Sequence, residues 1–199
     1  MDGQIILYNG PNSPFGRKTK VTAIVQEVKI EEKIIDVYKA DFLDKYNPLR
    51  KIPTLTVNQL SITDSDNICF YLDSLSKKQT LFPKKNYWEI MNITSIANGL
   101  MESVLERRME TIRSENEKSK SFINKQEIRI DRTIKWIENN WNNYNNSYLT
   151  MDQIAIACAL DYTIFRFNNK WKSENQKLKE WFEKFIKKDF MKTTKPYDK

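Results

Sequence analysis

The spacing at which apolar residues recur changes near residue 76, and this change limits the chain to two unlike parts. Before residue 76, short apolar runs alternate with a helical pattern, whereas after it apolar residues recur only at helical spacing. The 199 residues are enough for one large domain or two small ones. Glycine (4) and proline (6) are scarce, which favours a helix-rich protein over a turn-rich sandwich. We therefore expect a small α/β domain over residues 1–76, a linker over 77–86 and an all-helical domain over 87–199.

The first part has the predicted order β-α-β followed by α-β-β-α. Ser13 is a good N-cap, and Pro14 suits the first position of the helix after it. Two apolar runs separated by Asn58-Gln59 predict an antiparallel hairpin. We expect strands at 4–8, 33–37, 54–57 and 60–63, helices at 14–28 and 65–75, and a short helix or turn at 41–46.

The second part shows no convincing strand. The segment that leads into it is polar and contains a proline, as linkers often do. Asparagine is so frequent over 139–146 that we expect a loop there. The helices are expected at 87–113, 122–141, 149–167 and 178–186.

The chain contains no histidine and only two cysteines, Cys69 and Cys158. The lack of histidine excludes Ser-His-Asp and Cys-His catalysis, an imidazole general base, and zinc or haem held by histidine. The cysteines form neither a Cys-x-x-Cys redox pair nor a four-cysteine zinc site, and we expect no metal. Both lie among apolar neighbours at helical positions, so we expect them to be buried, reduced and unreactive.

The net charge of +7 is concentrated near the C-terminus, where residues 166–199 hold 11 basic and 5 acidic side chains. Such a cluster can attract polyanions, but a solvated helix face with a frayed tail is the simpler interpretation, and no nucleic-acid partner is expected. The longest apolar run, Ile154–Leu160, is far shorter than the roughly 20 residues that cross a bilayer. The N-terminus has no signal-peptide pattern. We therefore expect a cytoplasmic protein that is not bound to a membrane.

Four stretches together carry a resemblance to a known family. They are Ser13–Lys18 (SPFGRK), Asn47–Leu55 (NPLRKIPTL), Asp64–Leu72 (DSDNICFYL) and Leu149–Ala155 (LTMDQIA). In this order and spacing they resemble the glutathione S-transferase family, in particular the bacterial branch whose first helix opens with Ser-Pro-Phe. The resemblance covers essentially the whole chain. It implies an α+β protein with a thioredoxin-like domain followed by an all-helical domain.

The resemblance makes Ser13 the catalytic residue. In the family this position supplies the hydroxyl that hydrogen-bonds the sulfur of glutathione. A free thiol has a pKa of about 8.5. An O–H donor aimed at sulfur, at the positive end of a helix, favours the thiolate without any histidine. Helix capping alone is the alternative role for Ser13. Tyr8 is the rival donor, although core packing suits it better.

The resemblance also implies which residues bind glutathione, the co-substrate. In the family, Ile52-Pro53 holds a cis peptide bond that exposes the backbone of Ile52 to the cysteinyl part. Ser65 is expected to cap the following helix and bind the γ-glutamyl carboxylate, with Asp64 facing the ammonium group. Arg50 stands where the family usually has glycine. The glutathione-binding set is Phe15, Lys51, Ile52, Pro53, Asp64 and Ser65, with solvent exposure as the alternative for Lys51 and capping alone for Ser65.

The fourth stretch predicts a structural feature only. Thr150 and Gln153 have the spacing of a capping box, and Leu149 and Ile154 fit the hydrophobic staple around it. The family usually has an acid at position 153, whereas here the acid is Asp152.

In the family the second substrate lies between the Ser13 loop and the fourth helix. An apolar pocket there fits a hydrophobic carbon electrophile, which implies a detoxifying transferase, and the family analogy implies a homodimer. Two alternatives stay open: a non-catalytic binding factor of the stringent-starvation type that uses the basic C-terminal region, and a glutathione-dependent lyase or dehalogenase. The electrophile-site candidates are Tyr87, Met91, Ser95 and Arg108, with Phe15, Met101, Tyr162 and Phe165 as further lining residues.

Overall fold

The computed structural model describes residues 3–140 and 148–198. They divide into two compact units. The first unit runs to Phe82 and takes in again the residues from Asp189 onward, and the second is Pro83–Lys188. The boundary near residue 82 falls inside the expected linker. The residues from 189 onward group with the first unit, although the sequence pattern assigned them to the helical part.

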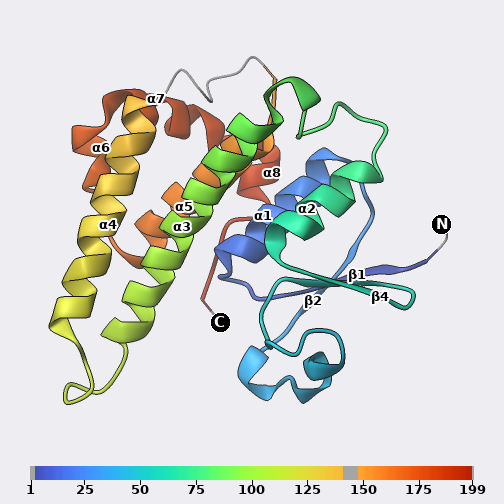
Figure 1. Ribbon diagram of the computed structural model, residues 1–199, viewed down its shortest axis with the longest axis horizontal. Helices are drawn as coiled ribbons and strands as arrows, with labels where there is room; N and C mark the ends of the chain where they lie inside the picture. The colour runs from blue at the N-terminus through green and yellow to red at the C-terminus, as the bar shows by residue number, and fades with distance from the viewer. Residues whose placement is uncertain (1–2, 141–147, 199) are drawn as a thin grey trace. The chain divides into compact units, whose positions relative to one another are not determined.

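The first unit is built on a four-stranded mixed sheet in the order β2-β1-β3-β4 (Figure 1). Strand β1 (Ile5–Asn9) pairs in parallel with β2 (Glu31–Ile34) and antiparallel with β3 (Thr54–Val57). The hairpin of β3 and β4 (Leu60–Thr63) has the predicted bounds. The predicted strand at 33–37 is wrong in position, because β2 ends at Ile34 and the chain then forms the 3₁₀ turn η1 (Val37–Lys39).

Alternation along β1 gives the sheet two buried faces. Leu7 points into a cluster with residues of α1 (Pro14–Val25) and α2 (Ser65–Ser74), which lie on the same side of the sheet (Figure 1). Tyr8 points to the other side, into a cluster that includes Leu43 of the 3₁₀ turn η2 (Asp41–Lys45).

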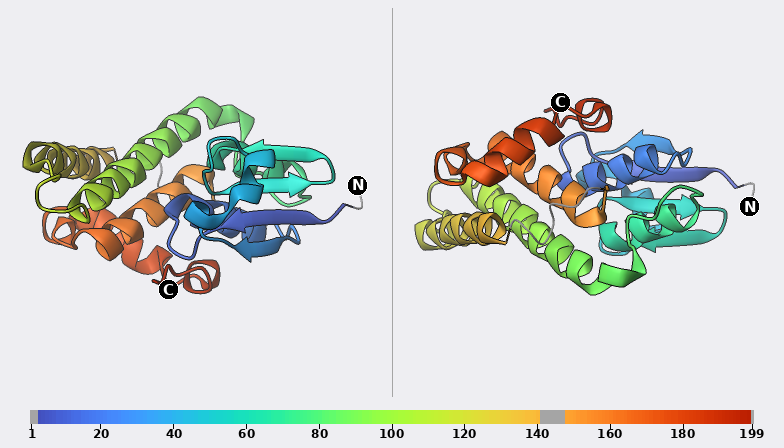
Figure 2. Two further views of the ribbon diagram at one scale, coloured as in Figure 1. Left: turned by 90° about the horizontal axis from the view of Figure 1, so that it is seen from below. Right: turned by 90° about the horizontal axis from the view of Figure 1, so that it is seen from above.

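The second unit contains only helices within its described residues. Helix α3 (Tyr87–Thr111) follows the turn η3 (Lys84–Asn86) and packs on both α4 (Lys120–Asn139) and α5 (Met151–Arg166), as the views of Figure 2 show for α3 and α4. Residues 151–160 of α5 are all buried, so this helix is the core of the unit. The helices α6 (Trp171–Glu174) and α7 (Gln176–Phe185) complete it. The carboxylate of Glu138 caps α7 by accepting from the backbone N–H groups of Lys177 (3.2 Å) and Leu178 (2.8 Å).

These elements confirm the predicted α+β class, with a thioredoxin-like domain followed by an all-helical one. The long helices lie within a few residues of their predicted bounds, while the short helices α6 and α8 (Asp189–Lys192) were not predicted. Most of the loop expected at 139–146 lies outside the described residues.

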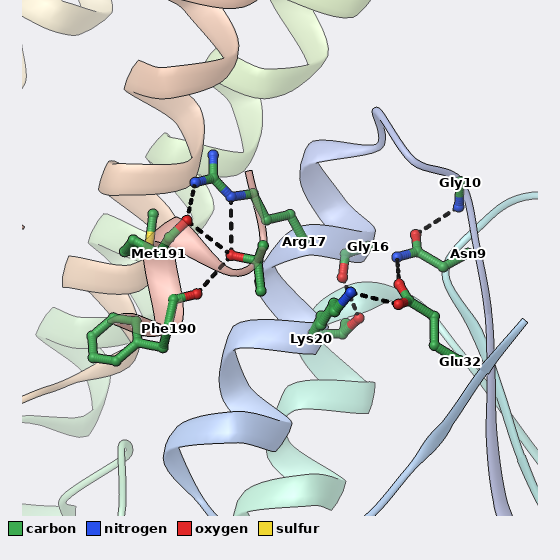
Figure 3. A network of polar contacts seen from close by, with 10 residues as sticks. Asn9, Gly10, Gly16, Arg17, Lys20, Glu32, Phe190 and Met191 are labelled. Carbon is green, nitrogen blue, oxygen red and sulfur yellow. Dashed lines mark hydrogen bonds and ion pairs between the residues drawn. The ribbon is translucent and has the colours of Figure 1, made fainter. Parts of the chain in front are cut away.

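The C-terminal segment is docked rather than frayed, which corrects the expectation from sequence. Its helix α8 (Asp189–Lys192) lies on α1, where the buried Arg17 donates to the Met191 carbonyl (3.0 Å) and the Thr194 hydroxyl (3.3 Å) (Figure 3). Beyond α8, the backbone N–H of Tyr197 donates to the Pro11 carbonyl at 3.3 Å. Most lysines of the basic cluster are exposed to solvent, as expected, whereas Lys172 and Lys179 are half-buried; the exposed ones are Lys170, Lys177, Lys184, Lys187, Lys188, Lys192 and Lys195.

Cys69 and Cys158 are both buried and free of disulfide bonds, as predicted. Among the helices that the structure describes, none has both the length and the apolar character needed to span a membrane. Over residues 3–140 and 148–198, no three side chains of the metal-binding types come together as a possible metal site.

Candidate active site

The register of the sheet brings the three glutathione-family stretches of the first unit to one end of it. Thr54 at the start of β3 pairs with Tyr8 near the end of β1 and with Thr63 at the end of β4. The Ser13 loop follows β1, the Ile52-Pro53 bond precedes β3, and Asp64 follows β4. These three segments therefore leave the same end of the sheet, and their side chains can serve one ligand.

Ser13 lies at the N-cap of α1 with extended backbone angles. Its Oγ accepts the backbone N–H of Gly16 at 3.1 Å, and its own N–H donates to the Gly10 carbonyl at 3.2 Å. Its hydroxyl hydrogen is donated to no other described residue, so it stays available to a ligand. The positive end of the helix dipole makes this position favourable for an anion.

The Ile52-Pro53 peptide bond is cis, as predicted. The backbone N–H and C=O of Ile52 form no hydrogen bond with any residue that the structure describes, so both can pair with an extended peptide. Gly10 of the Ser13 loop lies against this residue, because a Cβ at Gly10 would come within 2.7 Å of Ile52 Cδ1. The two loops therefore border the same space.

The turn before the cis bond is held by side chains. The Lys51 carbonyl accepts from Asn47 Nδ2 (2.9 Å) and from the Thr54 hydroxyl (2.8 Å). The Lys51 side chain is exposed, and its ammonium group pairs with no acidic group in the described chain. It can therefore contribute a positive charge to a ligand carboxylate, as the resemblance implied.

Arg50 adopts the left-handed conformation that glycine usually supplies, with φ of 49°. Its guanidinium binds Asp44 through two hydrogen bonds (2.5 and 2.7 Å) and reaches Asp41 at 2.9 Å. The hydrogen bonds from Arg50 lower the pKa of Asp44, and those to Asp44 raise the pKa of Arg50. The loop thus keeps a glycine-like backbone without the glycine.

Asp64, and not Ser65, is the N-cap of α2, which corrects the prediction. Its carboxylate accepts from the backbone N–H groups of Asp66 (2.8 Å) and Asn67 (3.3 Å), and its φ of 71° is rare for a residue with a side chain. Ser65 is the first helical residue and is 6% exposed. Its hydroxyl forms no hydrogen bond to another described residue, so it is available to an anion at the helix N-terminus.

The capping box predicted for α5 does not form. Thr150 is the N-cap, but its hydroxyl makes no capping hydrogen bond. Both oxygens of the fully buried Asp152 likewise lack a partner of hydrogen-bond geometry in the described chain. Burial raises the pKa of Asp152 to about 6, although the nearby Thr150 hydroxyl opposes part of that shift. The acid at position 152 is therefore an internal group and not a cap.

Tyr8 has the core role that the sequence favoured. It is 7% exposed and its ring lies 5.4 Å from that of Phe42 and 5.8 Å from that of Tyr46, measured between centroids. Phe15, in the first turn of α1, is half-buried.

The electrophile-site candidates belong to the helical unit. On α3, Tyr87 and Met91 are half-buried, and Ser95 and Arg108 are exposed, so these four can still contact a ligand. Met101 has no exposed surface and Tyr162 only 4%, which makes them core residues of that unit. Phe165, on α5, is half-buried.

Sequence reasoning gave no role to Lys18, which is fully buried and forms an ion pair with Asp66 in the first turn of α2. The pair ties α1 to the helix end that carries Ser65. The sequence did hold a sign that Lys18 is buried, because Lys18 stands on the apolar face of α1, three residues before Val21.

Comparison with known proteins agrees with this geometry. Residues 7–80 match the model of the glutathione S-transferase N-terminal domain. The uncharacterized GST-like protein YibF of Escherichia coli K12 is 26% identical over 160 residues, which cover 77% of this chain and 79% of that protein.

Solved structures extend the similarity to the whole chain. A glutathione S-transferase of Methylobacillus flagellatus with glutathione bound has a TM-score of 0.92 at 23% identity, covering 98% of this chain and all of that one. A glutathione transferase family member of Pseudomonas fluorescens Pf-5, also with bound glutathione, has a TM-score of 0.90 at 25% identity, with the same coverage. The protein thus has the glutathione S-transferase fold, and residues 7–80 match the model of that family's N-terminal domain.

Proposed function

We propose that the protein is a glutathione transferase in which Ser13 stabilises the thiolate of bound glutathione. The observation that carries the proposal is the Ser13 hydroxyl at the N-terminus of α1, beside the cis Ile52-Pro53 bond. No other described residue accepts its hydrogen. A hydrogen bond from this hydroxyl to sulfur favours the charged form and so lowers the pKa of the thiol. The thiolate is the nucleophile, so no histidine is needed.

Glutathione would lie across the end of the sheet. Its cysteinyl backbone would pair with the free N–H and C=O of Ile52. Its γ-glutamyl carboxylate would bind the Ser65 hydroxyl at the N-terminus of α2, near the exposed Asp64, whose carboxylate suits the ammonium group. Its glycyl carboxylate would be drawn to the unpaired ammonium group of Lys51. The relatives with bound glutathione support this choice of ligand.

The second substrate would be a hydrophobic carbon electrophile that the thiolate attacks, either by addition or by displacement of a leaving group. Tyr87, Met91, Ser95 and Arg108 remain the candidates for contacts with it. A homodimer in the cytoplasm and a detoxifying role also remain predictions. Size-exclusion chromatography with light scattering tests the dimer.

The experiment compares the wild type, Ser13→Ala and Ser61→Ala. Glutathione binding is measured by calorimetry, and conjugation by the absorbance of an aryl halide product. We expect Ser13→Ala to lower kcat/KM about 100-fold, as the loss of one preorganised donor does elsewhere, with a smaller effect on glutathione affinity. Ser61→Ala, on β4 away from this end of the sheet, controls for loss of a hydroxyl and should change neither.

Absence of both binding and conjugation in the wild type would contradict the proposal. So would equal activity of the wild type and Ser13→Ala. Binding without conjugation would instead indicate a glutathione-binding protein that does not catalyse transfer.

A further inference from the structure

The end of β1 holds a buried amide whose two polar atoms are both used. Asn9 is 3% exposed. Its Nδ2 donates to Glu32 Oε1 at 2.8 Å, and its Oδ1 accepts the backbone N–H of Gly10 at 2.8 Å (Figure 3). Reversing the amide would place its oxygen against the carboxylate and its NH₂ against an N–H group, so only one orientation satisfies both contacts.

Glu32 is itself held in place. Its second oxygen, Oε2, is paired with Lys20 Nζ at 2.5 Å, and both side chains are half-buried. Figure 3 shows this chain of contacts passing from α1 through β2 to the end of β1. The hydrogen bond that Asn9 donates is therefore charge-assisted and anchored to two further elements, which makes its geometry rigid.

Further hydrogen bonds link Asn9 to Ser13 through Gly10, and Ser13 to Gly16, which lies beside Asn9. Asn9 Oδ1 fixes the N–H of Gly10, and the Gly10 carbonyl accepts the N–H of Ser13 at 3.2 Å. Ser13 Oγ accepts the N–H of Gly16 at 3.1 Å. A contact between Gly16 and Asn9 closes this path into a ring of four residues: Asn9, Gly10, Ser13 and Gly16.

That last contact is steric. A Cβ added at Gly16 would lie 1.6 Å from Asn9 Oδ1 and 2.4 Å from its Cγ, far inside van der Waals contact. The Asn9 side chain can give way only by breaking its bonds to Gly10 and Glu32. Position 16 therefore needs glycine because Asn9 occupies the space beside it.

We propose that Asn9 is a positioning residue for Ser13. The lack of a side chain at Gly16 leaves the space that the Asn9 side chain needs for this role. This rests on the proposed function of Ser13. A hydroxyl stabilises a thiolate only at a limited distance and angle, and Asn9 sets both by fixing the loop from which Ser13 projects. A displacement of about 1 Å at a reacting group can cost on the order of 100-fold in rate.

The test uses Asn9→Ala, Gly16→Ala and the double variant. Gly99→Ala is the matched control, because it also replaces a helical glycine but its added Cβ meets no heavy atom within 4 Å. Two properties are measured for each protein. One is the exchange of the Gly10 amide hydrogen, followed by NMR without glutathione. The other is the pH profile of kcat/KM for aryl halide conjugation.

We expect the Gly10 amide to exchange at least about tenfold faster in Asn9→Ala, because its acceptor is gone. The apparent pKa in the pH profile should rise toward that of free glutathione, and kcat/KM at pH 6.5 should fall by about tenfold or more. Gly16→Ala should cause a similar loss alone but less than about a twofold further loss in the Asn9→Ala background, since the collision has been removed. Gly99→Ala should match the wild type.

Two results would overturn the proposal: an unchanged Gly10 exchange rate and pH profile in Asn9→Ala, or effects of the two substitutions that simply multiply. If Gly16→Ala does not fold, Asn9→Ala alone decides, since it removes atoms and creates no collision. If the wild type neither binds glutathione nor conjugates, the proposed function fails. The Gly10 exchange rate then still shows whether Asn9 fixes the Ser13 loop.

Discussion

Replacing the buried acid of α5 by its amide should stabilise the protein at neutral pH. Asp152 has no exposed surface, and neither of its oxygens has a partner of hydrogen-bond geometry in the described chain. Burial disfavours the charged carboxylate and raises its pKa from 3.8 to about 6. Asp152→Asn keeps the shape of the side chain and removes the charge.

The size of the effect follows from the shift. A difference of about 2 pKa units between folded and unfolded states, at 1.36 kcal/mol each, corresponds to about 3 kcal/mol. Because the folded pKa is raised, the folded state binds the proton more tightly than the unfolded state. The contribution of Asp152 to stability is therefore most favourable below pH 4, falls as the pH rises from about 4 to 6, and is fully lost above that range.

The assay is urea unfolding of the wild type and Asp152→Asn at several pH values between 4 and 7.5. We expect the two proteins to differ little at pH 4. At pH 7.5 the variant should be more stable by up to about 3 kcal/mol, less whatever the new amide loses through unsatisfied hydrogen bonds. Asp131→Asn is the control. Burial, with Glu174 and Glu127, also raises the pKa of Asp131, but its side chain is exposed, so the change should stay within about 0.5 kcal/mol.

A variant that is equally or less stable than the wild type at pH 7.5 would refute this reasoning. A stability difference that does not change between pH 4 and 7.5 would also refute it, because the effect would then not come from ionisation of Asp152.

Three further predictions concern contacts of the first unit, and each is checked by thermal or urea unfolding. Met191→Ala should cost about 2–5 kcal/mol because Met191, on α8, is fully buried, whereas the exposed neighbour variant Lys192→Ala should change stability by less than about 0.5 kcal/mol; equal effects would mean that α8 is not docked. Arg50→Gly should be tolerated better than Arg50→Ala, since the site has a φ of 49°, and the reverse order would contradict the left-handed backbone. Lys18→Met should cost up to about 3–5 kcal/mol because it removes the ion pair with Asp66, and adding Asp66→Asn should recover part of that loss; additive losses would exclude a functional ion pair.

Local patterns predicted the parts of the fold that local physics decides. The hairpin 54–57 and 60–63 follows from two alternating runs around a short turn, and the structure has the same bounds. The Ser13 cap and Pro14 at the first helical position follow from residue chemistry. The cis Ile52-Pro53 bond was available only through the family resemblance.

The predictions from sequence were wrong or incomplete where contacts between distant residues determine the structure. Asp64 and Ser65 are both good capping residues, and only the backbone path after β4 makes Asp64 the cap. The C-terminal segment looked like a solvated tail because its lysines are frequent, yet the buried Met191 and Thr194 and their hydrogen bonds with Arg17 dock it. The role of Asn9 depends on Glu32, which is 23 residues away in sequence, so no local pattern could reveal it.

The most direct test of the account is the ionisation of glutathione in the complex. The ultraviolet absorbance of the thiolate is recorded against pH for glutathione bound to the wild type and to Ser13→Ala. We expect the bound thiol in the wild type to titrate clearly below its free pKa of about 8.5 and to return toward that value in Ser13→Ala. An unshifted titration in the wild type, or an equal shift in both proteins, would contradict the claim that the Ser13 hydroxyl stabilises the thiolate.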